Sequence, residues 1–319
     1  MIITLTANPS LDRTASLEAP LQRGQVQRVT GVTVEPGGKG VNVARAIHYA
    51  GHQVLAVMPA PDTDPILSAL DGLGVAYSIV PVAEGVRMNL TLTEPDGTTT
   101  KLNEPGPVLD DALVQQLAGL VVERAAGADW AVLSGSLPPG VPADFYASLV
   151  VALRPLGVKV AVDTSDEPLQ ALVDAFPDAA PDLLKPNSEE LAQLTGADAE
   201  QLEASAKAGD PSAAVTAARS LVQRGVGAVL GTLGGSGAVL VTAEGAWHAA
   251  PPPITPRSTV GAGDSSVAGY VLADCAGSEA PERLRTAVAY GSAAASLAGS
   301  ALPRPDQLNP ADVVITDLV

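Results

Sequence analysis

The chain has little cysteine, little positive charge and no long apolar run, and each shortage excludes a class of protein. Cys275 is the only cysteine among 319 residues, so an internal disulfide cannot form, which argues against a secreted scaffold and favours the cytoplasm. We expect Cys275 to be a small buried apolar side chain on a helix. No stretch reaches about 18 consecutive apolar residues, so we expect neither a membrane-spanning helix nor a membrane partner.

Basic residues are scarce relative to acidic ones, with 18 Lys and Arg against 35 Asp and Glu and a formal net charge of −17. Nonspecific binding to nucleic acid needs a basic face, so we expect no nucleic-acid partner. The same charge repels phosphates, and exposed charges are screened beyond about 8 Å at physiological salt. A phosphate ligand would therefore need glycine-rich backbone amides and a few cations placed beside it.

Apolar runs typical of strands alternate with segments of helical period, which predicts a mostly parallel sheet covered by helices on both faces. The opening MIITLTANPS lacks a basic segment and a cleavage site, so it predicts a first buried strand rather than a signal peptide. The expected strands are 2–7, 53–58, 76–82, 130–133, 158–163, 183–186, 228–233 and 238–242. The expected helices include 41–49, 110–126, 143–154 and 213–224, followed by the consecutive pair 262–276 and 281–298.

Two strand-like stretches, about 12–36 and 85–104, do not fit this alternation. In the second, polar and apolar residues alternate on both sides of Asp96-Gly97, which is a strong hairpin signal. We expect the two insertions to form a small second sheet that closes over a cleft or pairs with a second subunit. An ordinary surface hairpin is the alternative.

The sequence STVGAGDSS places Gly261, Ala262, Gly263 and Asp264 directly before a helical segment. The first amides of a helix lack internal partners, so they can converge on an anion. Asp264 would repel a resting phosphate there, but it fits a base that accepts a proton from a hydroxyl attacking phosphorus. The alternative is that Asp264 only caps the helix.

A second glycine-rich turn, PGGKGVNVARA, leads into a helix near the N-terminus. Gly37, Gly38 and Gly40 precede that helix, and Lys39 supplies a cation. The spacing G-x-x-x-x-G-K-[ST] is absent, which excludes an ordinary P-loop ATPase. A tight turn without a ligand is the alternative interpretation.

Two further motifs lie in the second half of the chain. GTLGGSGAVLV follows a strand and precedes another strand, whereas a dinucleotide-binding fingerprint needs a helix there, so a nicotinamide enzyme is disfavoured. The turn could instead lie under the phosphates of a nucleotide. In LLKPNSEEL, Asn187 and Glu190 lie three residues apart at a helix start, which suits magnesium or, alternatively, a capping box.

Taken in order, TLTANPSLDRT, GGKGVNVARA, SGSLPPG, VDTS, LLKPNSEEL, TLGGSGA and STVGAGDSSVAGY resemble the ribokinase-like superfamily, the carbohydrate kinases of the phosphofructokinase B type. The resemblance covers essentially the whole chain. It implies one α/β kinase domain, 1–319, a three-layer α/β/α sandwich with a mostly parallel sheet and a lid formed by the two insertions. It also implies ATP as co-substrate, Mg²⁺, and transfer of a phosphoryl group to a sugar hydroxyl.

The resemblance assigns site residues by position in the matching motifs. Asp264 is the catalytic base, and the amides of Gly261, Ala262 and Gly263 form the anion hole. The metal-associated residues are Asn187 and Glu190. The nucleotide site comprises Lys185, Asn187, Thr232, Gly234, Gly235, Ser236, Gly237 and Gly263. The sugar site comprises Asp12, Gly37, Gly38, Lys39, Asn42 and Arg87, of which Arg87 matches the position that meets a sugar phosphate.

Within this superfamily, ANPSLDRT, TEPDG and SGSLPPG look most like the group that phosphorylates fructose 1-phosphate to fructose 1,6-bisphosphate. Kinases of tagatose 6-phosphate and of fructose 6-phosphate are close relatives and remain alternatives. A sugar-phosphate-binding regulator without turnover is the alternative from another class, although the intact Asp264 motif argues against it. The exposed lid sheet is a candidate surface for a homodimer.

Overall fold

In the computed structural model, which describes residues 1–318, a ten-stranded sheet runs in the order β14-β13-β12-β11-β10-β9-β8-β1-β4-β5. The strands from β5 to β11 pair in parallel, and β12, β13 and β14 continue the sheet antiparallel. These strands are β1 (Ile2–Thr6), β4 (Val54–Ala60), β5 (Tyr77–Pro81), β8 (Trp130–Ser134), β9 (Lys159–Asp163), β10 (Leu183–Leu184), β11 (Ala228–Thr232), β12 (Ala238–Thr242), β13 (Ala246–Ala250) and β14 (Val314–Asp317).

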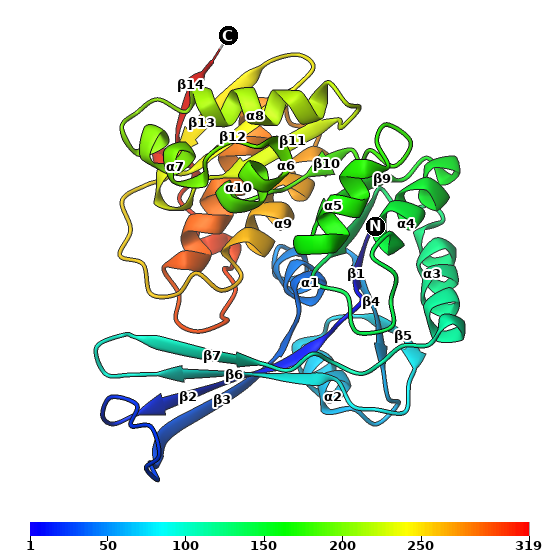
Figure 1. Ribbon diagram of the computed structural model, residues 1–319, viewed down its shortest axis with the longest axis vertical. Coiled ribbons are helices and arrows are strands. Elements are labelled where there is room, and N and C mark those ends of the chain that lie inside the picture. Colours follow the sequence, from blue (N-terminus) through cyan, green and yellow to red (C-terminus); the bar gives the residue numbers. More distant parts are fainter. Residues whose placement is uncertain (319) are drawn as a thin grey trace.

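Helices cover both faces of this sheet (Figure 1). The helices are α1 (Lys39–Tyr49), α2 (Pro65–Leu73), α3 (Asp111–Ala125), α4 (Phe145–Leu153), α5 (Asp166–Asp174), α6 (Ser188–Thr195), α7 (Ala199–Lys207), α8 (Ser212–Val222), α9 (Ala262–Cys275) and α10 (Ala280–Ala295). The expected three-layer α/β/α architecture is therefore confirmed. No helix within residues 1–318 is both long and apolar enough to cross a membrane.

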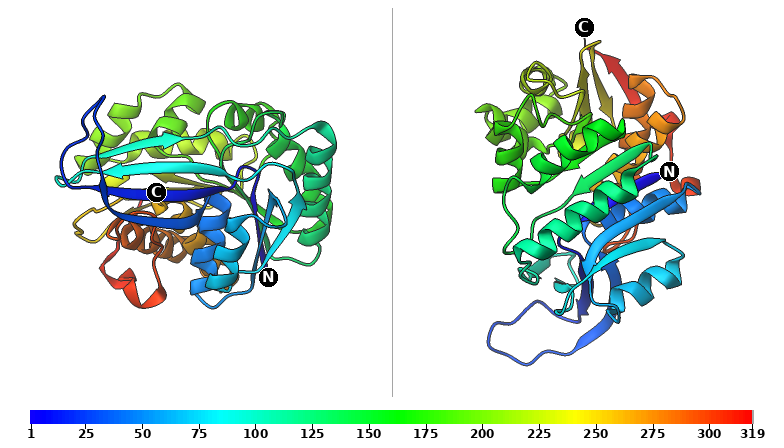
Figure 2. Two further views of the ribbon diagram at one scale, coloured as in Figure 1. Left: turned by 90° about the horizontal axis from the view of Figure 1, so that it is seen from below. Right: turned by 90° about the vertical axis from the view of Figure 1, so that its right-hand side faces the viewer.

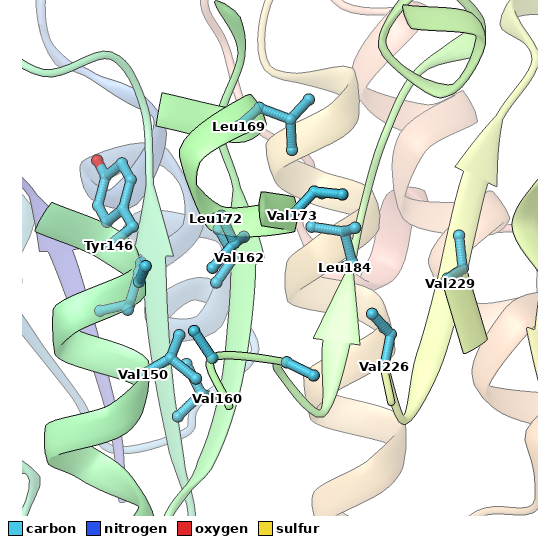
Figure 3. Packing of buried hydrophobic residues seen from close by; sticks show 14 of the residues in the cluster. Tyr146, Val150, Val160, Val162, Leu169, Leu172, Val173, Leu184, Val226 and Val229 are labelled. Atoms are coloured by element: carbon cyan, nitrogen blue, oxygen red, sulfur yellow. The ribbon is translucent and has the colours of Figure 1, made fainter. Parts of the chain in front are cut away.

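Two hydrophobic cores form because successive strand residues point to opposite faces of the sheet. Ile3 and Val229 face the core under α3, α4, α5 and α8, whereas Ile2 and Leu230 face the core under α1, α2, α9 and α10. Figure 2 shows these two groups of helices on opposite sides of the sheet. Figure 3 shows part of the first core, where side chains of α4 and α5 pack on β9, β10 and β11.

The two insertions form a separate four-stranded sheet of order β3-β2-β6-β7, as the sequence predicted. Its strands are β2 (Ser10–Leu17), β3 (Val29–Gly37), β6 (Arg87–Thr93) and β7 (Thr99–Asn103). In Figure 1 this sheet extends to one side of the main body. The expected hairpin joins β6 to β7, and Gly97 adopts the positive φ of 91° that its tight turn requires.

Some elements were not anticipated. They are the short helices α2, α5 and α7 and the strands β13 and β14, whereas the helix start at α6 was expected from Asn187 and Glu190. The expectation that Cys275 is buried is wrong, because it is the last residue of α9 and is exposed, and the buried run of that helix ends at Asp274.

Candidate active site

The glycine-rich motifs meet at the carboxyl ends of the parallel strands, beside the base of the small sheet. Thr6 ends β1, Ser134 ends β8 and Asp163 ends β9, and these strands are neighbours in the sheet. Ligands of open parallel sheets bind at this edge, where helix N-termini and polar loops converge.

Helix α9 begins at Ala262, after Gly261 with a φ of 76°. The Ala262 amide, expected in the anion hole, instead donates to the Thr259 carbonyl oxygen at 3.4 Å, whereas the amides of Gly263 and Asp264 donate no backbone hydrogen bond to any residue of the described chain, 1–318. The Asp264 carboxylate caps nothing, because it lies in the first turn and no side-chain cap bond forms at this helix. Instead, Asn42 Nδ2 donates to Asp264 Oδ2 at 2.9 Å. The alternative that Asp264 is only a helix cap is therefore wrong.

The glycines of the GGKG turn allow close packing of α1 against its neighbours. A Cβ on Gly37 would lie 2.3 Å from Asp12 Oδ2, and one on Gly40 would lie 2.3 Å from the Leu5 carbonyl oxygen. Gly38, with a φ of 99°, precedes the first residue of α1. The tight-turn interpretation therefore describes the backbone correctly, and the same turn aims Lys39 and Asn42 at the carboxyl edge of the sheet.

Asp12 is oriented by two donors on the small sheet. Ser10 Oγ donates to Asp12 Oδ1 at 2.8 Å, and Asn89 Nδ2 donates to the same atom at 2.9 Å. Asp12 Oδ2 receives neither bond and faces Gly37. This second oxygen is available to accept a hydrogen bond from a ligand.

Two lysines share one buried carboxylate. Asp163 Oδ1 lies 2.9 Å from Lys39 Nζ and 3.2 Å from Lys185 Nζ, and the Asp163 side chain is only 1% exposed. Burial alone would raise the pKa of Asp163, but the charges of Lys185 and Lys39 hold it below its usual value. Lys39 experiences the reverse: burial would lower its pKa, yet Asp163 and Asp264 raise it above its ordinary value. Lys39 is therefore charged at neutral pH.

Lys185 lies beside the start of α9. A Cβ on Gly263 would lie 3.6 Å from Lys185 Nζ. The structure thus brings together Lys39, Lys185 and Asp264 around Asp163. Their charges are two positive and two negative when both carboxylates are ionised.

Arg87 begins β6 and lines an open cavity of about 440 Å³. Its Nη1 donates to the Glu104 carbonyl oxygen at 3.2 Å, its Nη2 lies 3.4 Å from Ser136 Oγ, and its buried Nε has no hydrogen-bond partner within the described part of the chain. The rest of the lining is Asn8, Pro105, residues 136–141, Ala143, Glu167 and Pro168. A guanidinium with a spare donor at the wall of a cavity suits a phosphate group, which it can grip through two hydrogen bonds.

The turn after β11 lies beside a second cavity of about 530 Å³. Gly234, Gly235 and Ser236 form a 3₁₀ turn, and a Cβ on Gly237 would lie 1.9 Å from the Ala249 carbonyl oxygen. The cavity is lined by Leu233, Gly235 and Ser236 from this turn and by Glu200, Glu203, Ala204 and Lys207 from α7. The α7 wall of this cavity was not anticipated from the sequence.

Asn187 and Glu190 form the capping box that the sequence left open as an alternative. Asn187 Oδ1 accepts from the Glu190 amide at 2.7 Å, and Glu190 Oε2 accepts from the Asn187 amide at 2.9 Å. Asn187 also forms a β-bridge with Thr232, which links this helix start to the end of β11. The second Glu190 oxygen accepts no hydrogen bond from residues 1–318 and can face a ligand, whereas the Asn187 oxygen is already used.

Comparison with known proteins identifies this arrangement. The model of the pfkB family of carbohydrate kinases matches residues 6–307. This chain belongs to the pfkB carbohydrate kinase family. As a pfkB kinase it is a phosphotransferase that acts on a hydroxyl group with ATP as co-substrate, so the alternative of a regulator without turnover is set aside.

The pfkB kinase is similar to sugar-phosphate kinases over nearly its full length. It is 36% identical to the 1-phosphofructokinase of Xanthomonas campestris, covering 85% of this chain and 83% of the relative. It is 35% identical to the ATP-dependent 6-phosphofructokinase isozyme 2 of Escherichia coli, covering 94% of each chain. The crystal structure of phosphofructokinase-2 from Escherichia coli in complex with substrates and products superposes with a TM-score of 0.86 at 34% identity, covering 96% of each chain.

Three polar residues of this pfkB kinase site were missed by sequence reasoning. Asp163 lies in the VDTS segment, Asn8 follows β1, and Ser136 follows β8. The available signal was position: each lies at or just after the carboxyl end of a strand in the parallel sheet, where sites form. Because the sequence does not show which strands are neighbours, this signal does not predict that Asp163 contacts Lys39.

The pH profile should show an acidic limb controlled by Asp264. Burial, with a smaller contribution from Asp163, raises the pKa of Asp264 to about 6. A base works only when deprotonated, so kcat should fall as the pH falls through about 6. In Asp163→Asn a neighbouring negative charge is lost, so the pKa of Asp264 falls and the limb should move to lower pH.

Initial rates between pH 5 and 8 test this prediction, with the exposed Asp111→Asn as the matched control. A limb that stays in place in Asp163→Asn, or one that moves equally in Asp111→Asn, would contradict it.

Proposed function

We propose that this kinase transfers the γ-phosphoryl group of ATP to the 6-hydroxyl of fructose 1-phosphate, yielding fructose 1,6-bisphosphate and ADP. The observation that carries the proposal is the meeting of Asp264, Lys39 and Lys185 at the free amides of α9. The relatives named 1-phosphofructokinase support the choice of acceptor.

Each site residue has a role in this reaction. Asp264 accepts the proton of the acceptor hydroxyl, whose oxygen forms a bond to the γ-phosphorus while the bond to the ADP oxygen breaks and ADP leaves with the electron pair. The amides of Gly263 and Asp264 and the two lysines stabilise charge on the transferring group. Asn42 orients Asp264, and Asp12 accepts a hydrogen bond from another sugar hydroxyl.

The remaining groups hold the two phosphates. Arg87 binds the phosphate already present on the sugar, in the cavity that it lines. Thr232 and the turn Gly234–Gly237 hold the nucleotide phosphates. In an acidic protein these local donors must neutralise both anions, because the overall field opposes binding.

Magnesium is the metal that we propose accompanies ATP. Mg²⁺ in kinase sites uses one or two carboxylates together with substrate phosphates and water, so a large cluster of acidic side chains is not needed. The free Glu190 oxygen fits this role, and Asn187 supports it by fixing the Glu190 backbone. When bound, the metal would neutralise phosphate charge.

We also propose that residues 1–319 act as one kinase domain in the cytoplasm and that the four-stranded sheet is its lid. The lid exposes Val29, Val32 and Val34 on β3, with 44%, 43% and 52% of their surface accessible. Burying this apolar face supports a homodimer formed through the lid.

A second candidate activity is phosphorylation of fructose 6-phosphate, supported by the 35% identity to isozyme 2 of Escherichia coli 6-phosphofructokinase. The two acceptors differ in which end of the sugar carries the phosphate. A coupled assay of ADP release with fructose 1-phosphate, fructose 6-phosphate, tagatose 6-phosphate and free fructose separates them.

We expect the highest kcat/KM with fructose 1-phosphate and the lowest with free fructose, which cannot use Arg87. A preference for fructose 6-phosphate would replace the first assignment with the second. Fastest turnover of free fructose would overturn both.

A further inference from the structure

Arg45 is a buried cation that the proposed chemistry does not use. It lies on α1 with 3% of its surface exposed, its Nη1 donates to the Pro36 carbonyl oxygen at 2.9 Å, and its Nη2 lies 3.5 Å from Glu35 Oε2. A buried charge is costly unless it is paired, so Arg45 fixes the end of lid strand β3 against α1.

Glu35 has a second partner from a distant part of the chain. Ser300 Oγ donates to Glu35 Oε2 at 2.7 Å, and Ser300 is 8% exposed. The neighbouring Gly299 faces β2, since a Cβ on it would lie 3.8 Å from Thr14 Oγ1. The segment after α10 thus lies against the neighbouring strands β2 and β3 of the lid.

The same segment touches the anion-binding end of α9. Leu302 is 5% exposed, and its Cδ2 lies 2.9 Å from the position that a Cβ on Gly261 would occupy. On the lid, Glu35 is the cross-strand partner of Asp12, the residue proposed to bind the sugar. A continuous set of contacts therefore runs from the acceptor side, through Glu35 and residues 299–302, to the start of α9.

We propose that Glu35, held by Arg45 and Ser300, is a positioning residue that couples seating of the lid on the acceptor to the shape of the anion hole at Gly261. Glu35 touches neither substrate. Its side chain is one-third exposed, so water can replace the Ser300 contact when the lid lifts, whereas the Arg45 contact with Pro36 stays buried. Acceptor and nucleotide should then bind with positive coupling, each raising the affinity for the other by the same factor.

The inference rests on the proposed phosphotransfer, and its test distinguishes a failure of the inference from a failure of that proposed activity. The acceptor used is the one of the four sugars that the ADP-release assay ranks first, so an error in the assignment of fructose 1-phosphate does not affect the outcome. Calorimetry measures the Kd of that acceptor with and without a non-hydrolysable ATP analogue, in wild type, Ser300→Ala, Glu35→Gln and the double variant. Ser300→Thr retains the hydroxyl, and Ser296→Ala, in the same segment but bonded only to Ala293, is the matched control.

Coupling energies typically correspond to about 5- to 150-fold changes in affinity. We expect such coupling in wild type and a loss of most of it in Ser300→Ala and in Glu35→Gln. The double variant should lose no more, because both changes break the same contact, that between Glu35 and Ser300. Ser300→Thr and Ser296→Ala should keep it. Absence of coupling in wild type, unchanged coupling in the single variants, or losses that multiply in the double variant would overturn the proposal.

Thermal unfolding of each variant identifies any general loss of structure. A Ser300→Ala protein that unfolds at the wild-type temperature and still binds ATP, but has lost the coupling, would support a positioning role over a merely structural one.

Discussion

Replacing Asp264 with asparagine should lower kcat by about 10²- to 10⁴-fold, the range expected for removing a general base. Asparagine keeps the size of the side chain and can still contact Asn42, but it cannot take the proton of the acceptor hydroxyl. The α9 amides and the lysines are retained, so the Kd of ATP should change little. Rapid-quench kinetics and equilibrium binding measure the two quantities separately.

The same substitution should make the protein more stable at pH 7.5. The folded-state pKa of Asp264, about 6, lies above its ordinary value of 3.8, so the native state binds the proton more readily and loses stability as the pH rises from 3.8 to 6. That rise corresponds to a cost of about 3 kcal/mol at most, which asparagine avoids. Unchanged turnover in Asp264→Asn would defeat the base assignment, and a lower unfolding temperature at pH 7.5 would contradict the buried-charge argument.

Arg87→Ala should reduce kcat/KM for the sugar phosphate by about 30-fold or more, because removing one partner of a desolvated charge pair costs about 2 to 5 kcal/mol. The effect should appear mainly in the KM of the sugar phosphate, with little change in the KM of ATP. Arg87 lines the cavity at the base of the lid and makes only long contacts with Glu104 and Ser136. The guanidinium is therefore free to hold a ligand.

Steady-state kinetics with each substrate varied in turn measure the penalty, and the exposed Arg219→Ala on α8 is the matched control. Equal increases in the KM of the sugar phosphate and the KM of ATP would show that Arg87 does not bind the acceptor. A variant that handles free fructose and the sugar phosphate equally well would confirm that Arg87 recognises the phosphate.

Local sequence signals predicted the parts of the site in which the chemistry lies within one motif. The start of α9, the GGKG turn and the lid hairpin each depend on glycines and neighbouring residues, whose backbone requirements can be read from a short window. The same local information left Asp264 open as a cap or a base. The Asn42 contact, made across 222 positions of the chain, decided against the cap.

Contacts across the fold could not be predicted in this way. Asp163 meets Lys39 because β9 and the start of α1 reach the same edge of the sheet, 124 positions apart in sequence. Glu35 and Ser300 are separated by 265 positions. Such pairs depend on strand order and lid placement, which hydrophobic periodicity does not specify. The exposure of Cys275 likewise depends on where the buried part of α9 ends.

A crystal structure with a non-hydrolysable ATP analogue and the sugar phosphate tests the central claim most directly. The γ-phosphorus should lie against the amides of Gly263 and Asp264, with the acceptor hydroxyl within hydrogen-bonding distance of the Asp264 carboxylate. A γ-phosphate held elsewhere, with no acceptor hydroxyl near Asp264, would contradict the account.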